Sequence, residues 1–329
     1  MFGSLTWDLD PILLHLGPLQ IRYYGVMFAI TIYTGFYIWR RQALRNGESP
    51  EFAENFLWYG VVAVVGGARL GHCLFYEPNT FLGDLAVWFQ SPIAYHAAHS
   101  KFLPAILRFW EGGLASHGAT VGLFIALWLY ARKYKRTWVR LGDYLAPAIA
   151  IAAGGVRIGN FFNSEIVGRL TDLPWGVRFV RYCKMENIPL SVCEPRHPSA
   201  VYEVIMGIIT YFAVMEVQRR DIRRAGSGLM AGVFLTVYFF FRFTVEFFKE
   251  FQIEQLRTEG PLGGIEQAIN FHFTMGQWLS VIPVIIGIFL IARALRQPKD
   301  MFAIATPTPD PDTQGKQQHV ANKATRRSK

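Results

Sequence analysis

Apolar stretches close to 20 residues long recur along this chain, separated by more polar segments. An α-helix needs about 20 apolar residues to cross a hydrocarbon core about 30 Å thick. The pattern therefore predicts an all-α polytopic membrane protein with seven transmembrane helices. The predicted helices span residues 17–39, 56–76, 113–131, 143–163, 199–217, 228–248 and 275–292.

The connections between the predicted helices differ in length and composition. Residues 77–112 and 164–198 are long and rich in aromatic residues and proline. We expect these two outer loops to form a small extracytoplasmic head, with a plain linker as the alternative interpretation. Residues 298–329 are rich in Pro, Thr, Gln, Lys and Arg, which is typical of a disordered basic tail. The chain is thus predicted to divide into a membrane domain, residues 1–297, and a cytoplasmic tail.

Basic residues are distributed unevenly over the predicted connections. Of the 33 Lys and Arg residues, twenty follow the first, third, fifth and seventh helices, whereas nine lie in the opposite loops. Cytoplasmic loops carry an excess of Lys and Arg, so the N-terminus is predicted outside and the C-terminus inside. The net charge of +9 is therefore interpreted as a topology signal, and no nucleic-acid partner is expected.

Four arginines fall inside the predicted helices: Arg22, Arg69, Arg157 and Arg242. An arginine at mid-helix costs about 2.5–3.5 kcal/mol on insertion scales, so four of them indicate a use. With the predicted topology, all four lie in the outer half of the membrane. Other polar residues are expected at the same depth: His117, Asn160, Asn163, Glu165, Tyr202, Glu203, Glu246 and Gln277. The sequence therefore predicts a polar layer at the level of the outer-leaflet headgroups.

This polar layer suits a phosphate ligand. A guanidinium group binds phosphate through two parallel, charge-assisted hydrogen bonds. Arg157 and Asn160 share one helix face, whereas Arg242 and Glu246 are four residues apart and are expected to pair. A phospholipid phosphate is thus the predicted ligand. The alternatives are a snorkelling arginine with a packing role, for Arg22 and Arg69 above all, and a purely internal salt bridge for Arg242.

The remaining reactive side chains indicate neither a metal nor a cofactor. His117 lies between glycines at a helix start and is a candidate base, with a structural role as the alternative. No histidine pair has HExxH spacing, and neither a GxSxG elbow nor a P-loop occurs. Cys73 lies in a predicted helix. Cys183 and Cys193 share one loop and form a disulfide if it faces an oxidising compartment, but two unpaired thiols fit the sequence as well.

Short blocks rich in glycine, aromatic and charged residues occur along most of the chain. They are IRYYG (Ile21–Gly25), GGARLGHCLFY (Gly66–Tyr76), GGLASHG (Gly112–Gly118), GGVRIGNFFNSEIVGR (Gly154–Arg169), RHPSAVYE (Arg196–Glu203), FRFTVEFF (Phe241–Phe248) and MGQWLS (Met275–Ser280). In this order they resemble the prolipoprotein diacylglyceryl transferases of bacterial membranes. The block that ends at Arg169 is the most specific, because it is similar to the family pattern GRxGNFxNxExxGR.

The resemblance implies a reaction, a location and a set of residues. Such enzymes transfer the diacylglyceryl group of phosphatidylglycerol to the thiol of the lipobox cysteine in prolipoproteins, releasing glycerol phosphate. The implied location is the bacterial cytoplasmic (inner) membrane, with the active site on the outer-leaflet side. The implied catalytic residues are His117, Arg157, Arg242 and Glu246. The implied phosphatidylglycerol-binding residues are Tyr24, Arg157, Asn160, Glu165, Gly168 and Arg242, and further candidates are Arg69, Asn163 and Glu203.

The chain departs from the family pattern in several places. Val156 precedes Arg157 where a glycine is expected. Ala115 and Ser116 precede His117 where Ser-Phe is more frequent, so the surroundings of the histidine are expected to differ. The loops that are longer than expected are residues 79–104, 183–195 and 250–272. They are candidates for altering substrate access or the choice of prolipoprotein.

Two other classes of protein share some of these features. A phospholipid transporter or flippase without covalent chemistry would use the arginines, but it needs polar residues down to the cytoplasmic half. The inner-half segments, such as AIAIAA and LTVYFF, are apolar instead. A structural or assembly protein explains neither the cost of the arginines nor their common depth. The transferase is therefore the main hypothesis.

Overall fold

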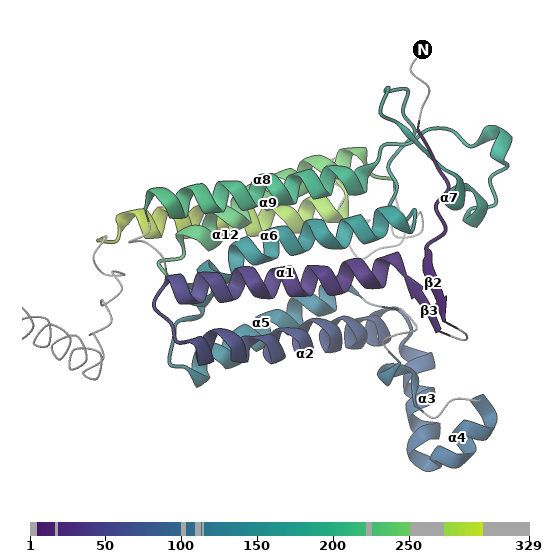
Figure 1. Ribbon diagram of the computed structural model, residues 1–329, viewed down its shortest axis with the longest axis horizontal. Helices are drawn as coiled ribbons and strands as arrows, with labels where there is room; N and C mark the ends of the chain where they lie inside the picture. The colour runs from purple at the N-terminus through teal and green to yellow at the C-terminus, as the bar shows by residue number, and fades with distance from the viewer. Residues whose placement is uncertain are drawn as a thin grey trace, which may run out of the picture.

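Seven long helices form the body of the protein in the computed structural model, which describes residues 5–16, 19–99, 103–108, 113, 115–221, 226–250 and 273–298. Figure 1 shows these helices aligned side by side in one bundle. They are α1 (Tyr23–Arg45), α2 (Pro50–Phe75), α5 (Ser116–Lys133), α6 (Trp138–Phe162), α8 (Ser199–Arg220), α9 (Leu229–Val245) and α12 (Met275–Arg296). Each predicted apolar stretch overlaps one of them.

Within the described residues, five helices are long and apolar enough to cross a membrane: α2, α6, α8, α12, and α9 together with the 3-10 helix η5 (Glu246–Phe248). The prediction of a mostly helical, multi-pass membrane protein is thus confirmed. The first helix was placed too early, because α1 begins at Tyr23 and residues 19–22 form a strand. Arg22 is the last residue of this strand, where it pairs with Ile12 of the neighbouring strand, and its side chain is exposed. Its assignment to a helix was therefore wrong.

Polar side chains fix where several helices begin. Ser49 accepts a hydrogen bond from the backbone N–H of Phe52 at the start of α2, and Thr137 accepts one from that of Arg140 in α6. Thr274 and Gln277 form a reciprocal capping box at the start of α12. Such caps satisfy N–H groups that lack a partner within the helix. The caps explain why α2 starts earlier than its apolar stretch.

Glycines let neighbouring helices approach closely. Gly118 of α5 faces α2 so closely that a Cβ there would lie 2.2 Å from the carbonyl oxygen of Gly67. At the C-terminal part of α1, by contrast, aromatic rings fill the core, with the centroids of Trp39 and Phe56 4.0 Å apart. The two packing modes occur at different levels of the bundle, since Gly67 lies in the C-terminal part of α2 and Phe56 near its start.

One end of the bundle carries a small head built from segments far apart in the sequence (Figure 1). The elements of this head are β1 (Leu5–Trp7), β2 (Ile12–Leu16), β3 (Leu19–Arg22), β4 (Val177–Phe179), α7 (Val180–Met185) and η3 (Leu190–Val192). β1 pairs in parallel with β4, and β2 pairs antiparallel with β3. Cys183 and Cys193 are joined by a disulfide, which decides the alternative that the sequence left open. None of the four strands was predicted.

Residues 77–112, predicted as a loop, contain helices. They are α3 (Pro78–Gln90), α4 (Pro92–His99) and the 3-10 helix η1 (Ala105–Leu107). Figure 1 shows α3 and α4 projecting from the end of the bundle that carries β2 and β3. Of the predicted tail, residues 299–329 lie outside the described residues, as does most of the long loop at 250–272.

Candidate functional site

A buried carboxylate near the start of α8 lies at the centre of the predicted site. Glu203 is fully buried. Arg157 of α6 forms an ion pair with it through Nε and Oε2. Arg242, in the last turn of α9, has its Nη1 3.8 Å from Glu203 Oε1, and the Nζ of Lys249 lies 3.2 Å from the same oxygen. One cation from α6 and two from the stretch that ends α9 thus compensate one buried charge, because a buried carboxylate is costly without such partners.

A second carboxylate, Glu246, extends this cluster. Arg242 Nη1 donates a hydrogen bond of 2.5 Å to Glu246 Oε2, and Lys249 Nζ lies 3.7 Å from that oxygen. The first turn of α12 packs against this group, since a Cβ on Gly276 would lie 2.7 Å from Glu246 Cδ. With Arg157 and Glu203, the cluster holds three cations and two carboxylates. These five side chains alone carry one unit of positive charge in excess, which favours an anionic ligand.

Outside this cluster, amide groups connect Arg157 to the exposed carboxylate of Glu165 just after α6. Arg157 Nη1 donates to Asn160 Oδ1 over 3.0 Å, in agreement with the predicted shared helix face. Glu165 is exposed and accepts two hydrogen bonds of 3.0 Å, one at each carboxylate oxygen. Asn160 Nδ2 donates to Oε2, and Asn163 Nδ2 donates to Oε1. Ser164 and the residue two further on have positive φ, which turns the chain so that Glu165 folds back onto the helix end. Arg157 is thereby held at two of its nitrogens.

Two other predicted residues, Tyr24 and Gly168, lie at close contacts that involve a glycine. A Cβ on Gly159 of α6 would lie 2.8 Å from the Tyr24 ring, so that ring rests against α6 one residue before Asn160. Gly168 donates its N–H to the carbonyl of His197 over 2.9 Å, and a Cβ there would lie 2.6 Å from the carbonyl of Phe248. The geometry of Gly168 therefore shows a packing requirement, and its contact with substrate stays a prediction.

Among the described residues, no hydrogen bond or ion pair joins His117 or Arg69 directly to the cluster. His117 is exposed on the first turn of α5, and among the described residues no hydrogen bond or ion pair links it to Arg157 or Arg242. Arg69 is buried, and it donates to the backbone carbonyls of Ala105 and Gly113 over 3.1 and 3.2 Å. It thus connects α2 to the segment before α5. The proposed role of His117 as a base stays a prediction.

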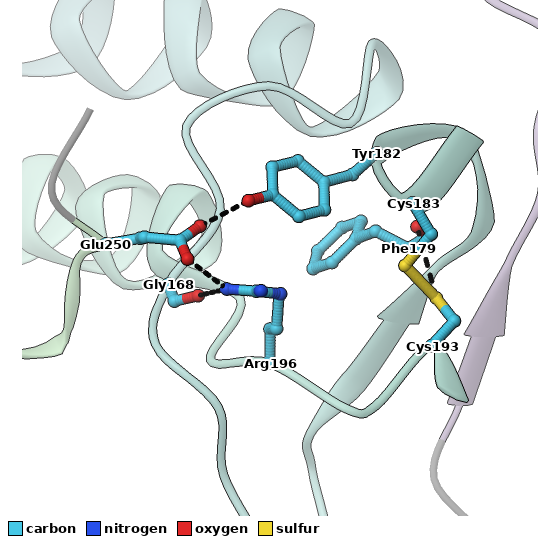
Figure 2. The surroundings of a disulfide bond; sticks show 7 residues. All are labelled: Gly168, Phe179, Tyr182, Cys183, Cys193, Arg196 and Glu250. Atoms are coloured by element: carbon cyan, nitrogen blue, oxygen red, sulfur yellow. Dashed lines mark hydrogen bonds and ion pairs between the residues drawn. A yellow bond between two sulfur atoms is a disulfide. The ribbon is translucent and has the colours of Figure 1, made fainter. Parts of the chain in front are cut away.

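Sequence reasoning overlooked the connection between this cluster and the head (Figure 2). Glu250, next to Lys249, accepts a 2.5 Å hydrogen bond from the Tyr182 hydroxyl and forms a 2.7 Å ion pair with Arg196. The Arg196 guanidinium lies 4.7 Å from the Tyr182 ring centroid. Burial, and then the hydrogen bond to Glu250, raises the pKa of the Tyr182 phenol to about 12. Cys183 of the disulfide follows Tyr182 directly, so the disulfide-closed segment is tied to the residue beside Lys249.

These features define a helical membrane protein in which three cations surround a buried carboxylate near a small head. Within the described residues, no three His, Cys, Asp or Glu side chains gather as potential metal ligands. The family model for prolipoprotein diacylglyceryl transferase matches residues 11–293. The match covers most of the chain, and the chain therefore belongs to the prolipoprotein diacylglyceryl transferase family.

Individual relatives agree with the family model. Each of three relatives is called a phosphatidylglycerol–prolipoprotein diacylglyceryl transferase. The protein from Chromohalobacter salexigens is 35% identical over 294 residues, covering 89% of this chain and 95% of the relative. The protein from Porphyromonas gingivalis is 37% identical over 299 residues, with 89% and 96% covered. That from Nitrosomonas europaea is 36% identical over 292 residues, with 87% and 90% covered.

Proposed function

We propose that this protein transfers the diacylglyceryl group of phosphatidylglycerol to the lipobox cysteine of prolipoproteins, as the first step of bacterial lipoprotein maturation. Membership of the family and the names of the relatives support this reaction. The observation that carries it in the structure is the pair of arginines, Arg157 and Arg242, each of which approaches a different oxygen of the buried Glu203 carboxylate. Their positive charge is suited to a phospholipid phosphate.

The chemistry explains why fixed cations help. The cysteine thiolate attacks the glyceryl carbon, a C–S bond forms, and the C–O bond to phosphate breaks. The phosphodiester carries one negative charge, and the departing glycerol phosphate gains a second one. Cations held in place before the reaction stabilise this developing charge without reorganisation. Arg157 and Arg242 are proposed to bind the phosphate, and Glu246 to orient Arg242.

The other predicted residues receive supporting roles in the same proposal. Asn160 and Glu165 position the glycerol headgroup or the Arg157 guanidinium, and Tyr24 and Gly168 shape the lipid site. The thiol must lose its proton to become a good nucleophile, and His117 is proposed to assist that step. Its exposure on α5 fits a residue that meets a second substrate rather than the buried lipid phosphate.

The membrane arrangement is part of the proposal. We expect all seven long helices to span the bacterial inner membrane, with the N-terminus outside, the C-terminus inside and the site at the outer leaflet. The Cys183–Cys193 disulfide supports an outer location of the head, because disulfides persist in oxidising compartments. The excess of basic residues on the opposite loops supports the same orientation.

The first experiment incubates the purified protein in detergent with phosphatidylglycerol and a lipobox peptide, and weighs the peptide by mass spectrometry. We expect the peptide to gain one diacylglyceryl unit, because the site stabilises the departing glycerol phosphate. A peptide with Ser in place of the lipobox Cys is the control and should gain nothing. No gain on the Cys peptide, with phosphatidylglycerol still bound, would point to lipid binding without transfer.

A further inference from the structure

Lys249 occupies an unusual position between the cation cluster and the head. Its side chain is only 8% exposed, although the residue follows the last apolar turn of η5. Its ammonium group lies between the two carboxylates, 3.2 Å from Glu203 Oε1 and 3.7 Å from Glu246 Oε2. Each of these carboxylates also contacts Arg242. Lys249 therefore shares its partners with an arginine that is proposed to bind phosphate.

We propose that Lys249 is a positioning residue for the transfer reaction, which holds Glu203 and Glu246 so that Arg157 and Arg242 remain able to bind the lipid phosphate. This inference rests on the proposed function. Lys249 acts through the carboxylates and has no need to touch the substrate. The sequence pattern alone assigns Lys249 no role, because the residue lies in a predicted outer loop.

Charge balance explains why the arginines need this help. With Lys249, two carboxylates face three cations, and the excess positive charge is available to an anion. Without it, Glu203 and Glu246 are matched in number by Arg157 and Arg242 alone. The 3.8 Å contact between Arg242 and Glu203 Oε1 would then shorten, because that oxygen has lost its nearer partner. Both guanidinium groups would be held by protein carboxylates instead of by phosphate.

The segment between α6 and β4 fixes the backbone of Lys249. Arg169 Nε donates to the Lys249 carbonyl over 3.0 Å, and Lys249 forms an isolated antiparallel bridge with Gly168. Figure 2 shows Glu250, the next residue, held between Tyr182 and Arg196. A long lysine side chain has considerable rotamer freedom. Because these contacts fix the backbone of Lys249, fewer side-chain conformations are available to its ammonium group when it pairs with Glu203.

The binding test measures the Kd for phosphatidylglycerol with full-length protein in detergent and no peptide. Lys249→Met is expected to raise the Kd about tenfold, because Glu203 and Glu246 would then engage the arginines that bind the phosphate. Lys249→Arg keeps the charge and should restore most of the affinity. Lys184→Met is the matched control, because Lys184 is an exposed head lysine whose Nζ lies 3.6 Å from Asp8. It should bind as the wild type does.

The kinetic test separates positioning from a general effect on folding. Lys249→Met is expected to lower kcat/KM for phosphatidylglycerol about 100-fold, as small misplacements of reacting groups do, while the KM for the lipobox peptide stays unchanged. Thermal unfolding of each variant identifies loss of fold, and Lys249→Arg provides the well-folded comparison. If Lys249 acts through Glu203, the losses in Lys249→Met and Glu203→Gln will not add in the double variant.

Two results would overturn the inference: a wild-type Kd and KM for phosphatidylglycerol in Lys249→Met, or losses that add fully in the double variant. Additive losses would mean that Lys249 acts independently of Glu203. A wild-type protein that binds phosphatidylglycerol but modifies no peptide would instead contradict the transferase function. The binding arm of the experiment would still decide the role of Lys249 in that case.

Discussion

Arg157 engages two different partners with two different nitrogens, Nε toward Glu203 and Nη1 toward Asn160. A lysine offers one compact ammonium group and cannot reproduce this fork. We therefore expect Arg157→Lys to lower kcat/KM about 100-fold, comparable to removing one donor from an oxyanion site. The measurement is the initial rate of lipobox-peptide modification at several phosphatidylglycerol concentrations.

The control for this substitution is Arg178→Lys, on the exposed face of β4. It makes the same chemical change on an exposed strand of the head, away from the cation cluster. It should therefore leave the rate unchanged. Wild-type turnover in Arg157→Lys would show that charge alone suffices. The assignment of a two-nitrogen contact to the reaction would then be wrong.

At this scale the sequence predicted contacts within helices better than contacts between them. Arg157 with Asn160, and Arg242 with Glu246, follow from three- and four-residue spacing on one helix. The central role of Glu203 depends on how α6, α8 and α9 pack, which no local spacing encodes. Glu203 was only a further candidate for that reason, and Lys249 received no role.

Helix α2 offers a pair of neighbouring glycines with opposite surroundings. A Cβ on Gly67 would lie 2.5 Å from the carbonyl oxygen of Gly118 in α5, whereas a Cβ on Gly66 would meet nothing within 4 Å. Gly67→Ala should therefore push α2 away from α5 and destabilise the protein by about 1–3 kcal/mol. Thermal unfolding in detergent should show a lower Tm.

Gly66→Ala is the matched control, since the same change is made one residue earlier in the same helix. Alanine is a better helix former than glycine by about 0.5–1 kcal/mol, so its Tm should equal or exceed that of the wild type. Equal Tm values for the two variants would contradict the close approach of α2 and α5. His117 would be expected to move with α5 in Gly67→Ala, because Gly118 is its neighbour.

Elements were predictable to the extent that their signal is local. Long apolar stretches located the seven helices, but hydropathy missed the first turns of α2 and α6, which begin after the capping residues Ser49 and Thr137. The strands were missed because they are three to five residues long. Leu5 also pairs with Val177, far away in the sequence. Such pairings depend on the packed helices that bring the ends of the strands together.

The whole molecule combines an apolar bundle with a head closed by a disulfide, and each part needs a different environment. The bundle exposes large apolar side chains such as Phe75, Phe212 and Phe289, which suits lipid. The head holds Lys249 in place through Glu250 and Arg196. A head on the oxidising side of the membrane would therefore keep the reaction site and its support together on that side.

The state of the three cysteines in cells tests this arrangement. Cys73 is free, whereas Cys183 and Cys193 are bonded. Protein from cells whose thiols are trapped at lysis should, after unfolding without reductant, take up one maleimide-polymer label, and three after reduction. Cys73→Ala is the control. This variant should take up no label before reduction, because its two remaining cysteines form the disulfide. Three labels without reductant would mean that the disulfide does not form in the cell, and the outer location of the head would lose its chemical support.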